Sequence, residues 1–181
     1  MKNWKMPVII IAVILTVILM FTFMLQGVQN KAINLEEQIT TAQSEIKIQE
    51  KRRADLIPNL VDCVKEYDKH EYNTLMAVIE ARGTNSDAVA DEIKTMISAV
   101  AEAYPELKSN TNYQNLMTEL ATTENLIANV RSNYNVWVTQ YNGHIRKFPN
   151  KQILNMLGYV STDYQKLTFN VSSDAPTNLF D

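Results

Sequence analysis

The stretch from Asn112 to Phe148 constrains the fold of this chain more than any other. It contains no proline and one glycine, Gly143. Its larger side chains recur every three or four residues, at Tyr113, Met117, Leu120, Ile127, Tyr134, Val138, Tyr141, Ile145 and Phe148. That spacing predicts one stripe along an α-helix of roughly 50 Å, at about 1.5 Å per residue. A helix this long and this amphipathic needs other helices to cover its stripe.

A second stretch, from Met6 to Leu25, has the length and composition of a membrane-spanning helix. It contains no charged residue, and among its apolar residues only Thr16 and Thr22 are polar. Such a run matches a hydrocarbon core about 30 Å thick. A cleaved signal peptide would have a shorter apolar run and a small-x-small cleavage site. We therefore predict a basic flank over residues 1–5 and a single-pass anchor in the lipid bilayer over residues 6–28.

The basic residues around this run predict its orientation. Lys2 and Lys5 precede it, and Lys31 is the one basic residue in the fifteen positions that follow it. The positive-inside rule then places the N-terminus in the cytoplasm and the rest of the chain outside the cell membrane. The difference is one or two charges, so a cytoplasmic bundle is the alternative.

The remainder of the chain shows further helical patterns. Residues 31–53 contain no helix breaker, and Pro58 is expected to kink or interrupt the helix that they form. The apolar pattern then resumes as far as Gly83, a good C-terminal stop. A third helix is predicted from an N-cap at Ser86 to the residue before Pro105.

These elements predict an all-α fold. An N-terminal transmembrane helix continues into an antiparallel bundle of three to four long helices, over residues 29–158. Residues 159–181 have no clear period and are predicted to form an extended, partly docked tail.

Composition excludes several classes of function. The formal charge of −3 gives no basic face for nucleic acid. A single cysteine, Cys63, excludes an intramolecular disulfide framework and a cysteine-based zinc cluster. The two histidines, His70 and His144, form no metal-binding motif, and Cys63 with His70 lacks a third orienting group. We therefore predict no catalytic residue, no metal and no cofactor.

Lys51, Arg52 and Arg53 form the one basic cluster of the sequence. Arginines hold carboxylates and phosphates through two parallel hydrogen bonds, so the cluster is a candidate site for an anion or an acidic partner. The competing interpretation, which we favour, is a charged face paired with acidic side chains of another helix.

Glu124 and Arg131 lie seven residues apart, on one helix face and two turns from each other. This separation is too long for a direct bond, so each is expected to meet a partner from another helix, and Arg53 and Asp55 are the candidates. Such a network would fix the register of the helices more than it would add to the stability of the fold. A ligand site in the bundle core is the alternative. Two further residues seven apart, Asn135 and Asn142, are predicted to set helix register.

Several segments, in this order, resemble the signature of the LemA family, bacterial membrane-anchored helical proteins. They are KRRADLIPNLV at residues 51–61, EAYPELK at 102–108, the series Glu119-Leu120, Glu124-Asn125, Arg131, Tyr134-Asn135, Tyr141-Asn142, Ile145 and Phe148-Pro149, and Gly158-Tyr159. The resemblance covers about residues 49–159; the part before Lys51 and the tail depart from it. It implies a helical domain behind one N-terminal anchor in a bacterial envelope, and it brings no established catalytic activity.

The sequence thus predicts a noncatalytic membrane protein that contacts an unknown protein partner, or another copy of itself, as an interaction or scaffolding element of the cell envelope. The alternative is a binding module for a small anionic ligand or a peptide, which uses charged residues between the helices. The candidate polar network for either role comprises Lys51, Arg52, Arg53, Asp55, Glu124, Arg131, Asn135 and Asn142.

Overall fold

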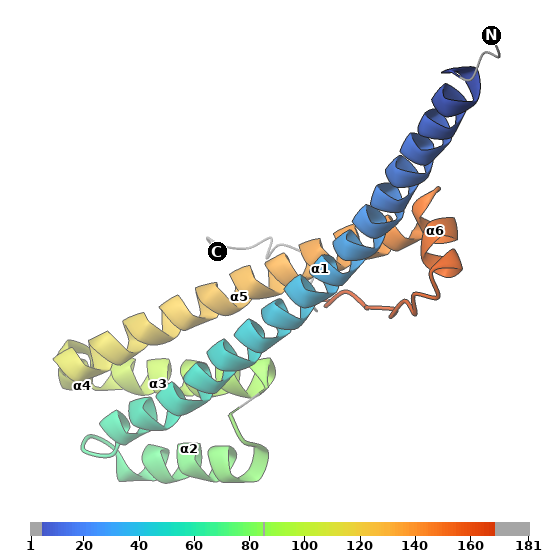
Figure 1. Ribbon diagram of the computed structural model, residues 1–181. Helices are drawn as coiled ribbons and strands as arrows, with labels where there is room; N and C mark the ends of the chain where they lie inside the picture. Colours follow the sequence, from blue (N-terminus) through green and yellow to red (C-terminus); the bar gives the residue numbers. More distant parts are fainter. Residues whose placement is uncertain (1–4, 85, 169–181) are drawn as a thin grey trace, which may run out of the picture. The chain divides into compact units, whose positions relative to one another are not determined.

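The computed structural model of the protein describes residues 5–84 and 86–168, and within them it contains six helices and no strand (Figure 1). The predicted all-α fold is confirmed. The chain divides into two compact units. We call residues 41–133 the bundle unit, and residues 1–40 together with 134–181 the stem unit. Residues 1–4 of the predicted flank (residues 1–5) and residues 169–181 of the predicted tail lie outside the described residues.

Helix α1 runs from Lys5 to Val64. Within the described residues it is the one helix long and apolar enough to cross a membrane, near its N-terminus. Every side chain from Met6 to Met24 is exposed. Further along, α1 buries one face at positions three and four apart: Ala32, Leu35, Ile39, Ala42 and Ile46. The helix therefore changes from apolar on all sides to amphipathic, as the sequence predicts.

Pro58 does not break α1, which continues to Val64. Proline has no backbone N–H, so the carbonyl of Ala54, four residues earlier, loses its helical donor. The hydroxyl of Thr84 donates a hydrogen bond to this carbonyl at 3.4 Å. The loop after helix α2 thus replaces part of the interaction that Pro58 removes.

The break comes later, between Val64 and helix α2 (Lys69–Arg82), and the sequence analysis missed it. Asp68 is the N-cap of α2, and its Oδ1 accepts hydrogen bonds from the backbone N–H groups of His70 and Glu71 at 2.9 and 3.1 Å. An aspartate followed three residues later by a glutamate is a helix-start signal that the sequence contains. Gly83 ends α2 with a φ of 71°, as expected of a C-terminal glycine.

Helix α3 (Asp87–Ala103) begins as predicted, because Ser86 Oγ accepts a hydrogen bond from the N–H of Val89 at 3.2 Å. A short helix that was not predicted, α4 (Pro105–Ser109), follows. Helix α5 (Thr111–Arg146) is the long helix predicted from the sequence.

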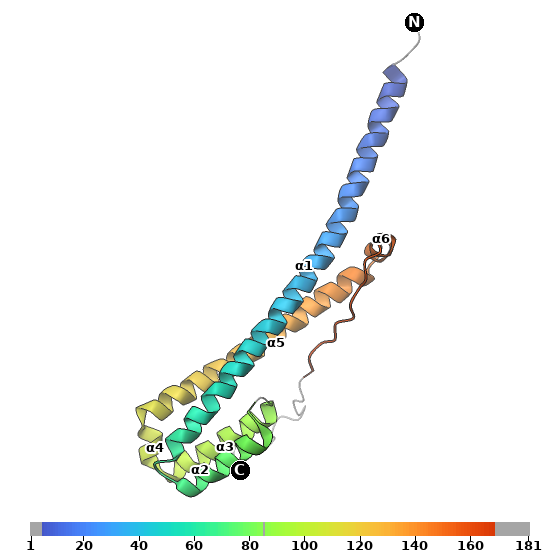
Figure 2. The same cartoon turned by 60° about the horizontal axis from the view of Figure 1, so that its bottom comes forward.

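Both views show α2, α3 and α4 beside the C-terminal part of α1 (Figures 1 and 2). The apolar core of the bundle unit includes Ile57, Leu60, Val61, Leu75, Ile93, Ile97, Leu107 and Leu120.

In the stem unit, the C-terminal part of α5 runs beside α1. Tyr141 Oη donates to Glu36 Oε1 at 2.9 Å, and His144 Nε2 lies 2.9 Å from the carbonyl oxygen of Val28. Helix α6 (Asn150–Met156) follows and buries Ile153 and Leu154.

The predicted stripe of α5 is buried at Tyr113, Leu120, Ile127, Tyr134, Val138 and Tyr141. Its last member, Phe148, is 82% exposed, which corrects the prediction, because α5 ends at Arg146.

The contact between Thr84 and the Ala54 carbonyl predicts a specific energetic coupling. Thr84→Val removes the hydroxyl with little change in volume, and we expect the free energy of unfolding to fall by about 0.5–1 kcal/mol. Combined with Pro58→Ala, which restores a backbone donor to the carbonyl, the same change should cost less. Urea denaturation of the four variants measures the coupling energy. A coupling energy of zero would contradict the inference that Thr84 compensates for the donor that Pro58 lacks.

Candidate functional site

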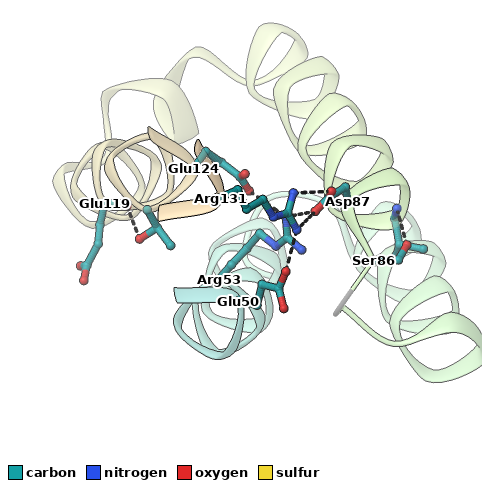
Figure 3. Close-up of polar contacts among 9 residues, drawn as sticks. Glu50, Arg53, Ser86, Asp87, Glu119, Glu124 and Arg131 are labelled. Carbon is teal, nitrogen blue, oxygen red and sulfur yellow. Dashed lines mark hydrogen bonds and ion pairs between the residues drawn. The ribbon is translucent and has the colours of Figure 1, made fainter. Parts of the chain in front are cut away.

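Five charged residues from three helices meet in the bundle unit (Figure 3). Glu50 and Arg53 come from α1, Asp87 from α3, and Glu124 and Arg131 from α5. We call these residues the charged cluster. Arg53 is 1% exposed, whereas the carboxylate of Asp87 is about half exposed. The cluster therefore extends from the interior of the unit to its surface.

Asp87 is the centre of the charged cluster. It is the first residue of α3, where the helix dipole favours a negative charge. Its Oδ1 accepts hydrogen bonds from Arg53 Nη1 at 2.7 Å and from Arg131 Nη2 at 3.1 Å. Its Oδ2 accepts a further bond from Arg131 Nη1 at 2.7 Å. One carboxylate thus joins α3 to both α1 and α5, and it binds Arg131 through two parallel bonds.

The other two carboxylates complete the cluster. Arg131 Nη2 also donates to Glu50 Oε1 at 2.6 Å, and Arg53 Nη1 lies 3.5 Å from Glu124 Oε1. Glu124 and Arg131 therefore each contact a residue of another helix. The structure places Arg53 opposite Glu124, but Arg131 meets Glu50 and Asp87 instead of Asp55.

The contacts stabilise the charged forms of these groups. The hydrogen bonds from Arg131 hold the pKa of the Asp87 carboxyl below its usual value, against the opposing effect of partial burial, and the bond from Arg53 adds to this. Asp87, and after it Glu50, raise the pKa of Arg131. Both guanidinium groups are bound by carboxylates of the chain, an arrangement that favours a structural network over a site for an external anion.

The remaining members of the basic segment are paired at the surface. Lys51 Nζ lies 3.1 Å from Asp55 Oδ2, one turn along α1, and Arg52 Nη2 lies 2.7 Å from Glu119 Oε1 on α5. These pairs are well exposed, and such pairs contribute about 0–1 kcal/mol each. Glu50, Asp87 and Glu119, which form ion pairs with the arginines, were not predicted from the sequence. Only Asp87 has a local signal, its position directly after an N-cap serine.

Asn135 and Asn142 lie in the stem unit and bind an extended segment of the same chain. Asn135 Nδ2 donates to the carbonyl of Leu167 at 2.9 Å, and its Oδ1 accepts the N–H of Leu167 at 2.8 Å. Asn142 Nδ2 donates to the carbonyl of Tyr164 at 3.0 Å. Instead of another helix, the two side chains hold the backbone of residues after Gly158, within the segment that was predicted to be an extended tail.

Two tyrosines, each directly before one of these asparagines, support the same segment. Tyr134 Oη donates to the carbonyl of Gln165 at 3.1 Å, and Tyr141 Oη accepts the N–H of Thr162 at 3.2 Å. The ring of Tyr164 packs edge-on against that of Tyr141, with centroids 5.3 Å apart. Burial raises the pKa of Tyr141, so its phenol stays protonated at neutral pH. We call Tyr134, Asn135, Tyr141 and Asn142 the backbone clamp.

Cys63 shows no activation. Its Sγ lies 3.4 Å from the carbonyl of Asn59, and burial, followed by the charges of Asp62 and Glu66, raises the pKa of its thiol. A thiol of raised pKa is a poor nucleophile at neutral pH. It lines an open cleft of about 440 Å³ together with Asn59, Asp62, Glu66, Asn110, Asn112 and Leu116. Within residues 5–84 and 86–168 there is no group of three or more His, Cys, Asp or Glu side chains suited to hold a metal ion.

Because Asp87 binds both arginines, we predict that removing its charge lowers the stability of the folded chain, and that the size of this effect depends on pH. Asp87→Asn removes the charge that both arginines bind and leaves the buried Arg53 with a weaker set of partners. We expect the free energy of unfolding at pH 7 to fall by about 2 kcal/mol, the scale of hydrogen bonds to charged groups, reduced by the exposure of Asp87.

The pKa of Asp87 is depressed in the folded state, so its stabilising effect is present above the unfolded-state pKa of about 3.9. It is lost as the pH falls through the lower folded-state value. The difference between wild type and Asp87→Asn should therefore be constant from pH 7 to about 5 and shrink below about 4. Asp91→Asn, at an exposed position one turn along α3, is the control. An equal effect at Asp91 would contradict the central role of Asp87.

Comparisons with known proteins show which family this sequence matches. The model of the LemA family matches residues 42–180 and so extends beyond the resemblance at residues 49–159, into the tail. Protein LemA of Metamycoplasma hominis is 29% identical over 140 residues, 71% of this chain and 64% of that protein. Magnetosome proteins MamQ 1 and MamQ 2 of Paramagnetospirillum magneticum are each 34% identical over 68 residues, 38% of this chain and 25% of each relative.

The chain therefore spans less than two thirds of the length of these relatives. Their names carry no enzymatic activity. Because the family model covers more than half of the sequence, including the segments that form α3, α5 and most of the bundle unit, this chain belongs to the LemA family.

Proposed function

We propose that this chain is a noncatalytic, membrane-anchored protein whose helical bundle contacts another protein in the bacterial cell envelope. One observation carries the proposal: the residues of the charged cluster, together with Arg52 and Glu119, pair with each other across α1, α3 and α5. A cluster paired in this way fixes the relative register of helices and leaves their outer faces available for contact.

The anchor is the N-terminal part of α1. Its residues 6–24 are exposed and almost entirely apolar, a condition that a helix tolerates in lipid far better than in water. The distribution of lysines around this segment supports an orientation with the bundle unit outside the cytoplasm. In this orientation the partner is a protein of the envelope or another copy of this chain.

Site-specific photocrosslinking in intact bacteria tests this role. A photoreactive amino acid is placed at exposed positions on three helices, Asn73 of α2, Lys94 of α3 and Asn125 of α5. We expect at least one of these three positions to give a crosslinked product, and the buried position Leu75 to give none. If none of the three exposed positions gives a crosslinked product, the proposed contact with another protein is contradicted.

The same cells report the orientation. With Cys63→Ser and Ser132→Cys, a membrane-impermeant maleimide should label the chain before lysis, because Ser132 is exposed on α5. Labelling only after lysis would reverse the proposed orientation and direct the partner search to cytoplasmic proteins.

A second function, peptide binding, is supported by the backbone clamp. Asn135 binds both the N–H and the carbonyl of one residue, which is recognition of backbone regardless of side chain. Asn142 Oδ1 is buried and has no hydrogen-bond partner among the described residues, so an acceptor in the clamp is unused by the present segment. The peptide form of a binding module therefore has more support than the anion form.

A labelled peptide of residues 159–168 tests the clamp in the full-length chain. Leu167→Pro removes the N–H that Asn135 Oδ1 accepts, so the internal segment competes less and the added peptide should bind about tenfold more tightly than to wild type. Adding Asn135→Ala should abolish the gain, whereas the exposed neighbour Gln140→Ala should retain it. If the affinity for the peptide is the same with and without Asn135→Ala, peptide binding by the backbone clamp is contradicted.

A further inference from the structure

The stem unit carries an apolar surface that its own helices leave uncovered. Phe148 and Val160, on either side of α6, are 82% and 87% exposed, and Met156 at the end of α6 is 63% exposed. Within α6, Ile153 and Leu154 are buried. Several large exposed apolar side chains within a short stretch of chain indicate a binding partner or a membrane.

The contacts between α5 and α1 set the level of this surface along α1. Tyr141 contacts Glu36, and His144, three residues later, contacts Val28. Helix α5 therefore runs toward the apolar segment of α1, which ends at Leu25, three residues or roughly 5 Å from Val28. Phe148 follows the last residue of α5, Arg146, by two positions. Both views show α6 at this end of α5 (Figures 1 and 2).

Basic side chains accompany the apolar ones. Lys147 and Lys151 are exposed, and neither has an ion pair among the described residues. Lys31, on α1 near the same level, is exposed as well. Aromatic and aliphatic side chains next to lysines are the composition of segments that lie in the membrane interface, with lysines directed to the headgroups.

We propose that Phe148, Met156, Leu157 and Val160, with Lys147 and Lys151, form a second membrane contact of this protein. These residues, which we call the α6 surface, lie in the headgroup region of the bilayer that α1 crosses, with the apolar side chains directed inward and the lysines bound to anionic lipids. The inference rests on the proposed insertion of α1. It adds that the stem unit is held at two points, which prevents free rotation about the axis of α1.

Depth measurements with a nitroxide label test the α6 surface. The full-length chain with Cys63→Ser is labelled at one introduced cysteine and placed in nanodiscs of phosphatidylcholine and phosphatidylglycerol. The positions are Phe148→Cys, Leu15→Cys inside the apolar segment, and Gln140→Cys, an exposed site on α5 further from that segment. The measured quantity is the ratio of label accessibility to oxygen over accessibility to a water-soluble nickel complex.

We expect the ratio at position 148 to lie between the high value at 15 and the low value at 140. An aqueous value at 148 with a lipid value at 15 would overturn the α6 surface and leave the anchor intact. An aqueous value at position 15 would instead overturn the anchor. Dipolar broadening between labels at position 148 would show that another copy of the chain covers the surface, which also contradicts the proposal.

The lysines give a second measurement with the same label at position 148. Anionic lipid attracts basic side chains, so the ratio at position 148 should rise with the fraction of phosphatidylglycerol. Lys147→Gln combined with Lys151→Gln should abolish this dependence, while Lys94→Gln in the bundle unit should not. A dependence that survives the double substitution would remove the lysines from the contact.

Discussion

The bundle unit depends on a single carboxylate. Asp87 accepts hydrogen bonds from Arg53 of α1 and Arg131 of α5 while it occupies the first position of α3. A buried guanidinium is costly unless its donors are satisfied, so Arg53, at 1% exposure, requires that α3 begin at this place. The N-cap at Ser86 provides this position, because it fixes where the helix starts and therefore where Asp87 points. A local capping signal thus determines a contact among three helices.

This dependence explains which parts of the structure were predictable from the sequence. The period of α5, the cap at Ser86 and the stop at Gly83 are local properties, and the structure has all three. The partner of Arg131 is not local, because Glu50 and Asp87 are 81 and 44 residues away and only packing decides between them and Asp55. The break after Val64 had a local signal at Asp68 that the expected break at Pro58 obscured.

The asparagines show how one spacing serves two different purposes. Residues seven apart lie on one helix face, and the sequence pattern is the same whether that face meets a helix or an extended segment. In the structure, the side-chain amides of Asn135 and Asn142 bind the backbone of Leu167 and Tyr164. An extended segment without regular structure must satisfy its N–H and carbonyl groups elsewhere, and the clamp provides these bonds. Periodicity located the face, but the identity of the bound segment needed the structure.

Phe148 links the error in the sequence analysis to the membrane proposal. Its position continues the stripe of α5, so periodicity alone assigned it to the core, yet the helix ends two residues earlier and the side chain is exposed. In water, exposure of a phenylalanine would be a net cost, whereas under the proposed insertion of α1 the side chain would lie in the membrane interface, where this cost is removed. Under the same proposal, the exposed apolar residues of α1 lie in lipid. Exposure in the structure is exposure to solvent or to lipid, and the chemistry of the neighbouring side chains distinguishes the two.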